Sequence, residues 1–208
     1  MNRIPTMLAL ACCAISSVVV ADEELGKGKL LVATDVVNGG AFEETVILLL
    51  SYDNTGAAGL VINRPTEAQP VQALPEFAGL DGYAGPLYWG GPVELFKLRA
   101  LLLSDAPPDN AAPILETVYL VPLQESLLDS AASEANLRFY VGYSGWSAGQ
   151  LEWEVATGSW HIVAATEALV FADDPSGVWR KLLPPPIRRV LLDQAKPSQR
   201  SVALLNSH

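Results

Sequence analysis

The chain has 208 residues, half of them hydrophobic, and its formal net charge at pH 7 is −10. A hydrophobic fraction of this size excludes a largely disordered chain. The acidic balance disfavours a nucleic-acid-binding role, because carboxylates repel phosphates.

The first 21 residues are predicted to be a secretory signal peptide that is not part of the fold. Arg3 precedes an apolar run from Ile4 to Val20, and Ala21 closes a set of small residues of the kind that a signal peptidase reads. The run falls short of the roughly 20 residues that a membrane span needs. We therefore expect cleavage near Ala21 and a periplasmic or secreted product.

Both cysteines, Cys12 and Cys13, lie within that leader. A mature domain without them has no disulfide and no thiolate chemistry. The alternative is a lipoprotein acylated at Cys12 or Cys13, and only in that case is the mature protein expected at a membrane. With two histidines in the chain, we expect no metal site, and the absence of a glycine-rich phosphate-binding spacing predicts no nucleotide cofactor.

Residues 22–183 are predicted to form a single domain, followed by a proline-rich and basic C-terminal tail over residues 184–208. The expected strands are Lys29–Ala33, Thr45–Ser51, Ala58–Asn63, Leu87–Trp89, Leu98–Leu103, Thr117–Val121, Arg138–Tyr143 and Trp160–Ala164. The expected helices are Gln124–Ala135, Ala148–Ala156 and Val178–Leu183. The turn residues Asp53–Gly56 predict that the second and third strands form a hairpin. Strands and helices that mix without strict alternation favour an α+β fold or irregular α/β packing.

The segment Gly145-Trp146-Ser147-Ala148-Gly149 fits the G-x-S-x-G nucleophile elbow of serine hydrolases, between a strand-like and a helix-like run. Its catalytic residues would be Ser147, Asp173 and His208. However, His208 is the last residue, where chains fray, and a general base must be held in place. A five-residue pattern is also a weak signal in a chain with 16 glycines. The serine hydrolase is therefore the alternative interpretation.

Three glycine- or proline-bracketed segments carry polar and aromatic residues at expected strand ends. We expect the Asn63–Pro65 turn, the Gly90–Pro92 turn and the Tyr143–Gln150 corner to meet in space, because turns at the ends of strands in one sheet tend to share an edge. Trp146 is expected to be buried. The plainer interpretation is that these are corner-turning residues and core aromatics. The candidate binding residues are Asn63, Arg64, Gly90, Gly91, Tyr143, Trp146 and Gln150.

Several spaced blocks, in order, resemble the AlgH/YqgE-like family over nearly the whole mature chain. They are Gly28–Ala33, Phe42–Leu49 followed by Gly56–Pro65, Trp89–Val93, and Gly142–Trp146 followed by Gly149–Glu152. The resemblance implies a bifurcated β-sheet with a small closed barrel, surrounded by helices, and no established catalytic residues. It also implies that the position of Ser147 varies among relatives, which makes the elbow a coincidence.

Two features depart from the family pattern. Many relatives carry a cysteine near the end of the second strand, where this chain has Leu50-Ser51, and relatives mostly lack a leader. The sequence therefore predicts an exported, non-enzymatic binding or accessory protein with an unknown protein or small-molecule partner. A serine hydrolase is the alternative, and a regulatory protein of the family is a more distant one.

Overall fold

The structure is a computed structural model that describes residues 23–37, 39–68, 83, 85–123 and 136–183. The predicted leader, the predicted helix at residues 124–135 and the C-terminal tail lie outside the described residues.

The described strands are β1 (Lys29–Ala33), β2 (Val46–Asp53), β3 (Gly56–Val61), β4 (Leu87–Trp89), β5 (Val93–Leu103), β6 (Ala112–Pro113), β7 (Val118–Val121), β8 (Leu137–Ser147) and β9 (Trp160–Ala164). The described helices are α3 (Gln150–Ala156), α4 (Glu167–Val170) and α5 (Val178–Leu182), with 3-10 turns η1 (Asp35–Val37) and η3 (Pro175–Gly177). These elements confirm the α+β class, with a sheet that dominates and short helices.

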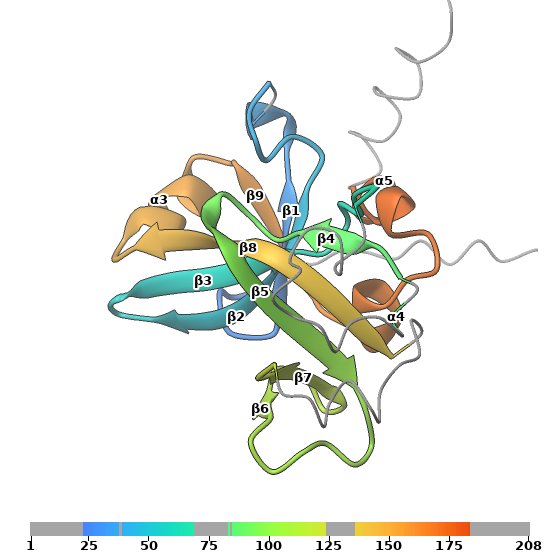
Figure 1. Ribbon diagram of the computed structural model, residues 1–208. Helices are drawn as coiled ribbons and strands as arrows, with labels where there is room; N and C mark the ends of the chain where they lie inside the picture. Colours follow the sequence, from blue (N-terminus) through green and yellow to red (C-terminus); the bar gives the residue numbers. More distant parts are fainter. Residues whose placement is uncertain (1–22, 38, 69–82, 84, 124–135, 184–208) are drawn as a thin grey trace, which may run out of the picture.

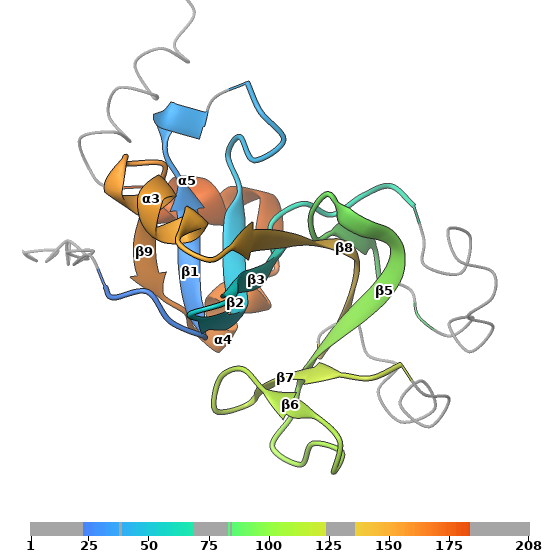
Figure 2. The same ribbon diagram turned by 90° about the vertical axis from the view of Figure 1, so that its left-hand side faces the viewer.

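The strands form one sheet in the order β6-β7-β5-β8-β3-β2-β1-β9. Figure 1 shows β8 crossing the centre of the molecule, and Figure 2 shows how far the β5–β7 arm turns away from β1–β3. The sheet therefore curls into a half-barrel. The closed barrel implied by the resemblance is not formed by the described strands, whose pairing path ends at β6 and at β9.

The sheet divides at β8, as the resemblance implied. β5 pairs along one edge of β8, whereas β4 pairs in parallel with residues 139–141 on the other edge. Further along that second edge, β3 pairs antiparallel with residues 144–147. The amide of Gly90 donates to Val141 O at 2.8 Å, and Gly90 O accepts from Val61 N at 3.0 Å, so the chain after β4 lies at the fork between β3 and β8.

The chain then passes over β8, because β4 and β5 lie on opposite edges of that strand. Two glycines permit the passage. A Cβ on Gly91 would lie 2.2 Å from Tyr143 C, and a Cβ on Gly142 would lie 2.2 Å from Gly91 O. No side chain fits at those distances, so Gly91 and Gly142 allow the two backbones to touch. We refer to residues Gly90–Pro92 as the crossover.

The structure corrects the predicted end of one strand and the start of one helix. β8 continues past Tyr143 to Ser147, because its last residues pair with β3. The helix expected from Ala148 begins at Gln150, since Gly149 adopts a left-handed conformation with φ 75°. The predicted hairpin is confirmed, with Asp53 paired to Gly56.

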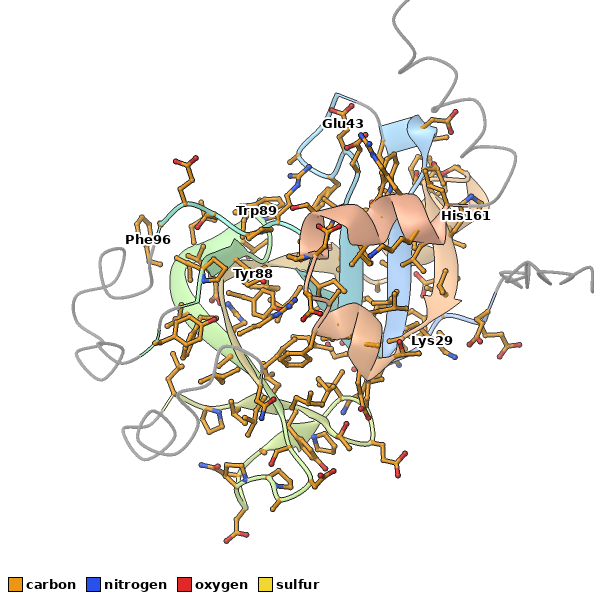
Figure 3. The ribbon with its side chains drawn as sticks, turned by 90° about the vertical axis from the view of Figure 1, so that its right-hand side faces the viewer. Lys29, Glu43, Tyr88, Trp89, Phe96 and His161 are labelled. Atoms are coloured by element: carbon orange, nitrogen blue, oxygen red, sulfur yellow. The ribbon has the colours of Figure 1, made fainter. Side chains whose placement is uncertain are left out.

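The two faces of the half-barrel have separate cores. One cluster joins residues of both arms, such as Leu48, Leu60 and Tyr140, with Trp179 of α5, so it fills the concave side. A second cluster lies on the convex side, where Trp146 and Trp160 pack with Leu151 of α3. Helices α4 and α5 thus cover one part of the concave face, as Figure 3 shows, and α3 covers the opposite face near the end of β8.

Candidate functional site

The three predicted turns meet. Trp89 N donates to Arg64 O at 3.0 Å, which joins the Asn63–Pro65 turn to the end of β4. The Ser144 hydroxyl donates to Gly90 O at 3.2 Å, which joins the crossover to β8. The expectation that the three turns lie together is therefore confirmed. The contacts of each residue show which side chains hold the chain in place and which line a pocket.

Asn63 and Arg64 hold the loop before β2. The buried Asn63 side chain accepts from Val46 N at 2.8 Å and donates to Glu44 O at 2.9 Å. The Arg64 guanidinium donates to the carbonyl oxygens of Ala41 and Glu43, and its Cζ lies 5.2 Å from the centre of the Trp89 ring. Burial lowers the pKa of Arg64. These donors are engaged within the protein, so both residues anchor the loop, and both also line a second pocket of about 410 Å³.

Trp146 belongs to a cluster centred on Glu154 of α3. Its side chain is 8% exposed, as the predicted burial requires. The indole N–H groups of Trp146 and Trp160 both donate to Glu154 Oε2 at 2.8 Å, and Gln150 Nε2 donates to Glu154 Oε1 at 2.9 Å. Sequence reasoning missed Glu154. The signal was its i,i+4 spacing from Gln150, which places both side chains on the same helix face.

Gln150 also contacts the strand. Its Oε1 accepts from Ser147 N at 3.1 Å, while its Nε2 reaches Glu154. The side chain therefore connects the last residue of β8 to the helix that follows. Together with the Trp146 contact, it fixes the end of β8 against α3.

The other face of the end of β8 is open and forms a pocket of about 520 Å³, which we call the concave pocket. It is lined by the β2–β3 hairpin (Ser51, Asp53, Thr55–Ala58), by Val93, and by Tyr143 and Gly145–Ser147 of β8. Ala58 shares a strand face with Leu60 of the concave core, because side chains alternate along a strand. The pocket is therefore the part of the concave face that lies beyond the packed core.

Small residues form its floor and hydroxyls and a carboxylate form its rim. Asp53 Oδ1 accepts from Thr55 N at 2.7 Å and from the Thr55 hydroxyl at 2.5 Å. These hydrogen bonds, the hydroxyl's first, hold the pKa of Asp53 below its ordinary value. No lysine or arginine lines the pocket among the described residues. The site therefore favours ligand groups that donate hydrogen bonds or carry positive charge.

Tyr143 forms one wall of the pocket. A Cβ on Gly145 would lie 3.1 Å from Tyr143 Cε2, so the ring leans over Gly145. On the other side, Arg99 Cζ lies 4.4 Å from the ring centre, and Arg99 pairs with Glu94 at 2.7 Å. Glu94 has a positive φ of 51° and also pairs with Lys97 at 2.7 Å. The wall is thus supported by a bulge at the start of β5, from which Phe96 projects in Figure 3.

The hydrolase residues do not assemble in the part of the chain that the structure describes. Ser147 ends β8 in regular pairing with Gly56, and the non-glycine residues with positive φ there are Glu44 and Glu94, so Ser147 lacks the strained turn of an elbow. Asp173 lies between α4 and η3 and does not line the pocket that Ser147 lines. His208 is outside the described residues, and His161 lies in β9.

Two further observations concern ligands and membranes. Within the described ranges, no three His, Cys, Asp or Glu side chains gather as a metal-binding group. The helices described there are all too short or too polar to cross a membrane.

Comparison with known proteins gives a consistent set of relatives. The model of the AlgH-like family matches residues 30–185. A UPF0301 protein of Chlorobium luteolum is 34% identical over 163 residues, covering 76% of this chain and 85% of that protein. A UPF0301 protein of Streptomyces coelicolor is 35% identical over 162 residues, covering 75% of this chain and 84% of that protein.

Two solved structures are similar in fold. The solution structure of the AlgH protein from Pseudomonas aeruginosa has a TM-score of 0.58 at 25% identity, covering 88% of this chain and 94% of that one. A crystal structure of a Corynebacterium diphtheriae protein has a TM-score of 0.66 at 21% identity, covering 81% of this chain and 93% of that one. The latter likeness concerns the fold alone.

Proposed function

This chain belongs to the AlgH-like family, and from that premise we propose that it is an exported, non-enzymatic binding protein that uses the concave pocket. The observation that carries the proposal is that the two faces at the end of β8 differ in packing. One face is fixed by Trp146 and Glu154 against α3, and the other is left open beside Tyr143 and Gly145. A rigid support behind an open face is what a preorganised binding site requires.

The chemistry of the pocket supports binding over catalysis. Its described rim offers hydroxyls and the Asp53 carboxylate, and no histidine lies on it to act as a base for Ser147. A fluorophosphonate probe and a general esterase assay test this point. We expect no labelling of the protein, whereas labelling that disappears in Ser147→Ala would establish the hydrolase instead.

A thermal-shift screen tests the binding proposal. A ligand that binds the folded state raises Tm by an amount that grows with the ligand concentration relative to its Kd. Ala58→Leu places a larger side chain on the pocket floor, and the same substitution at the exposed Ala112 of β6 is the matched control. A genuine ligand should shift wild type and Ala112→Leu equally and Ala58→Leu much less. Equal shifts for all three proteins would place the ligand elsewhere.

Export is part of the proposal and rests on the leader. Arg3, the apolar run to Val20 and the small residue Ala21 support cleavage near Ala21 and a periplasmic or secreted product. N-terminal sequencing of protein from the envelope fraction should begin near Asp22. An acylated Cys12 or Cys13 would make the protein membrane-anchored, and full-length protein in the cytosol would contradict export.

A further inference from the structure

The pairing register arranges the lining of the concave pocket in two rows across β2, β3 and β8. Directly paired residues of antiparallel strands carry their side chains on the same face of a sheet. Both rows therefore face the pocket, and each takes one residue from each strand. The first row is Ser51, Ala58 and Gly145, and the second is Asp53, Gly56 and Ser147.

The middle of the two rows is a flat floor of small residues. Gly56 and Gly145 have no side chain, and Ala58 has only a methyl group. β3 is paired on both edges at this place, so its backbone N–H and C=O groups are engaged within the sheet. The floor therefore offers a ligand an apolar surface on which a ring can lie flat.

Polar groups surround this floor. Ser51 and Asp53 stand on the β2 side and Ser147 stands at the end of β8, and all three residues are exposed. A carboxylate has lone pairs for about four hydrogen bonds, so Asp53 accepts from further donors besides Thr55. The distance from β2 across β3 to β8 is two strand spacings, about 10 Å. The pocket thus combines an apolar floor with a rim of hydrogen-bonding groups.

The charges of the pocket favour a neutral ligand. Asp53 is the one charged side chain of the described lining, and it repels anions. A single exposed carboxylate also attracts a cation weakly, because water and salt screen the charge. On the opposite wall, the Arg99 guanidinium lies 4.4 Å from the centre of the Tyr143 ring and disfavours a second cation there. Uncharged hydrogen-bond donors remain as the groups that match the rim.

We propose that the concave pocket binds a neutral saccharide, with the C–H face of a sugar ring on the floor and the ring hydroxyls against Ser51, Asp53 and Ser147. This inference rests on the proposed function and names its ligand class. A sugar ring with equatorial hydroxyls is apolar on both faces and polar around its edge, which is the pattern of the pocket. Two linked rings fill the distance of about 10 Å from β2 to β8.

A pair of disaccharides tests whether the ring lies flat. The probe is cellobiose, followed by the amide chemical shifts of the isotope-labelled protein, and we expect the largest shifts at Ala58, Gly145 and Ser147. β-1,4-linked mannobiose differs only in that one hydroxyl of each ring is axial. Successive β-1,4-linked rings present opposite faces, so one axial hydroxyl meets the glycine and alanine floor in either placement. Mannobiose should therefore bind at least about fivefold more weakly.

Variants and a charged analogue test the rim. Ser51→Ala and Asp53→Asn should each weaken cellobiose binding at least about threefold, because each alters a hydrogen-bonding group of the rim. Asp105→Asn, at an exposed loop residue outside the lining, is the control and should leave binding unchanged. Cellobiouronic acid, in which a carboxylate replaces one hydroxymethyl group of cellobiose, should bind wild type at least about tenfold more weakly. Asp53→Asn should recover part of that loss.

Several results would overturn the inference and leave the proposed function standing. Pocket shifts with 1,5-diaminopentane, but with neither disaccharide, would show that the pocket recognises a cation. Equal binding of cellobiose and mannobiose would remove the flat placement of the ring. Cellobiose binding that is unchanged in both Ser51→Ala and Asp53→Asn would remove the rim contacts. Pocket shifts with no probe at all, together with no Ala58-dependent ligand in the thermal-shift screen, would count against both proposals.

Discussion

Glu154 receives the hydrogen bonds on which the end of β8 depends. Its carboxylate accepts from the indoles of Trp146 and Trp160 and from Gln150. Glu154→Ala leaves two largely buried indole donors unpaired, and each unsatisfied donor costs about 1–3 kcal/mol. We expect the free energy of unfolding in urea to fall by about 2–4 kcal/mol. Glu152→Ala, on the same helix, removes one exposed contact with Tyr52 and should cost under about 1 kcal/mol. Equal losses would contradict this role for Glu154.

Trp146 and Trp153 give a second comparison between single residues. Trp146 is 8% exposed and packs in the convex core, whereas Trp153 of α3 is 66% exposed. Trp146→Ala should lower the free energy of unfolding by about 3–5 kcal/mol, as expected for a large aromatic removed from a core. Trp153→Ala should lower it by less than about 1 kcal/mol. Denaturant titration followed by circular dichroism measures both, and a small loss at Trp146 would contradict its position in the core.

At the scale of elements, the crossover makes a distinct prediction about glycine. Gly142 and Gly149 have nearly the same φ, 70° and 75°. A Cβ on Gly142 would meet Gly91 O at 2.2 Å, whereas a Cβ on Gly149 would meet nothing within 4 Å. Gly149→Ala should therefore lower the free energy of unfolding by only about 1 kcal/mol, which is the penalty for alanine in the left-handed conformation. Gly142→Ala must also separate two backbones, and we expect a loss of more than about 3 kcal/mol or failure to fold. Similar losses at the two sites in thermal unfolding would contradict the crossover.

The elements that the sequence predicted well are those set by local signals. The β2–β3 hairpin follows from apolar runs on either side of Asp53–Gly56, and β9 from the apolar run at Trp160–Ala164. The pairing of β4 with β8 joins segments about fifty residues apart, and no local signal specifies it. The end of β8 was misplaced for a related reason. Gly145 read as a corner residue, whereas the fold keeps it inside the strand, where the Tyr143 ring lies against it.

The distinction between local signals and long-range pairing applies to the candidate site as well. The sequence correctly grouped the three turns, because strand ends in one sheet tend to share an edge. It did not separate Arg64, which anchors the loop before β2, from residues that line the concave pocket, such as Tyr143. That difference depends on which face each side chain occupies. Asp53 and Ala58 of the hairpin were missed as pocket residues, because their position beside β8 arises from long-range pairing.

At the scale of the whole molecule, Arg138 connects the sheet to the helices that fill the half-barrel. Its buried guanidinium donates to Val170 O at 2.9 Å and to Ala172 O at 2.6 Å, and it lies over the rings of Tyr88 and Phe171. Arg138→Met leaves both carbonyl groups without this donor. We expect the free energy of unfolding to fall by about 2–4 kcal/mol.

The position of Arg138 also predicts which amides lose protection from hydrogen exchange when this side chain is replaced. Amide hydrogen exchange in Arg138→Met should quicken in α4 and in the residues that follow it, where Val170 and Ala172 accept from Arg138, more than in the β2–β3 hairpin. Uniform quickening across the sheet would show that Arg138 stabilises the fold generally and does not link its two layers.

The central claim for the whole molecule is that the open face of β8 is a binding site. The most direct test is an amide chemical-shift map of the labelled protein with the low-molecular-mass fraction of an envelope extract. We predict shifts that gather at the concave pocket, around Tyr143, Gly145 and Ala58, in wild type and in Ala112→Leu, and that are lost in Ala58→Leu. Shifts that gather elsewhere, or that persist unchanged in Ala58→Leu, would contradict the claim.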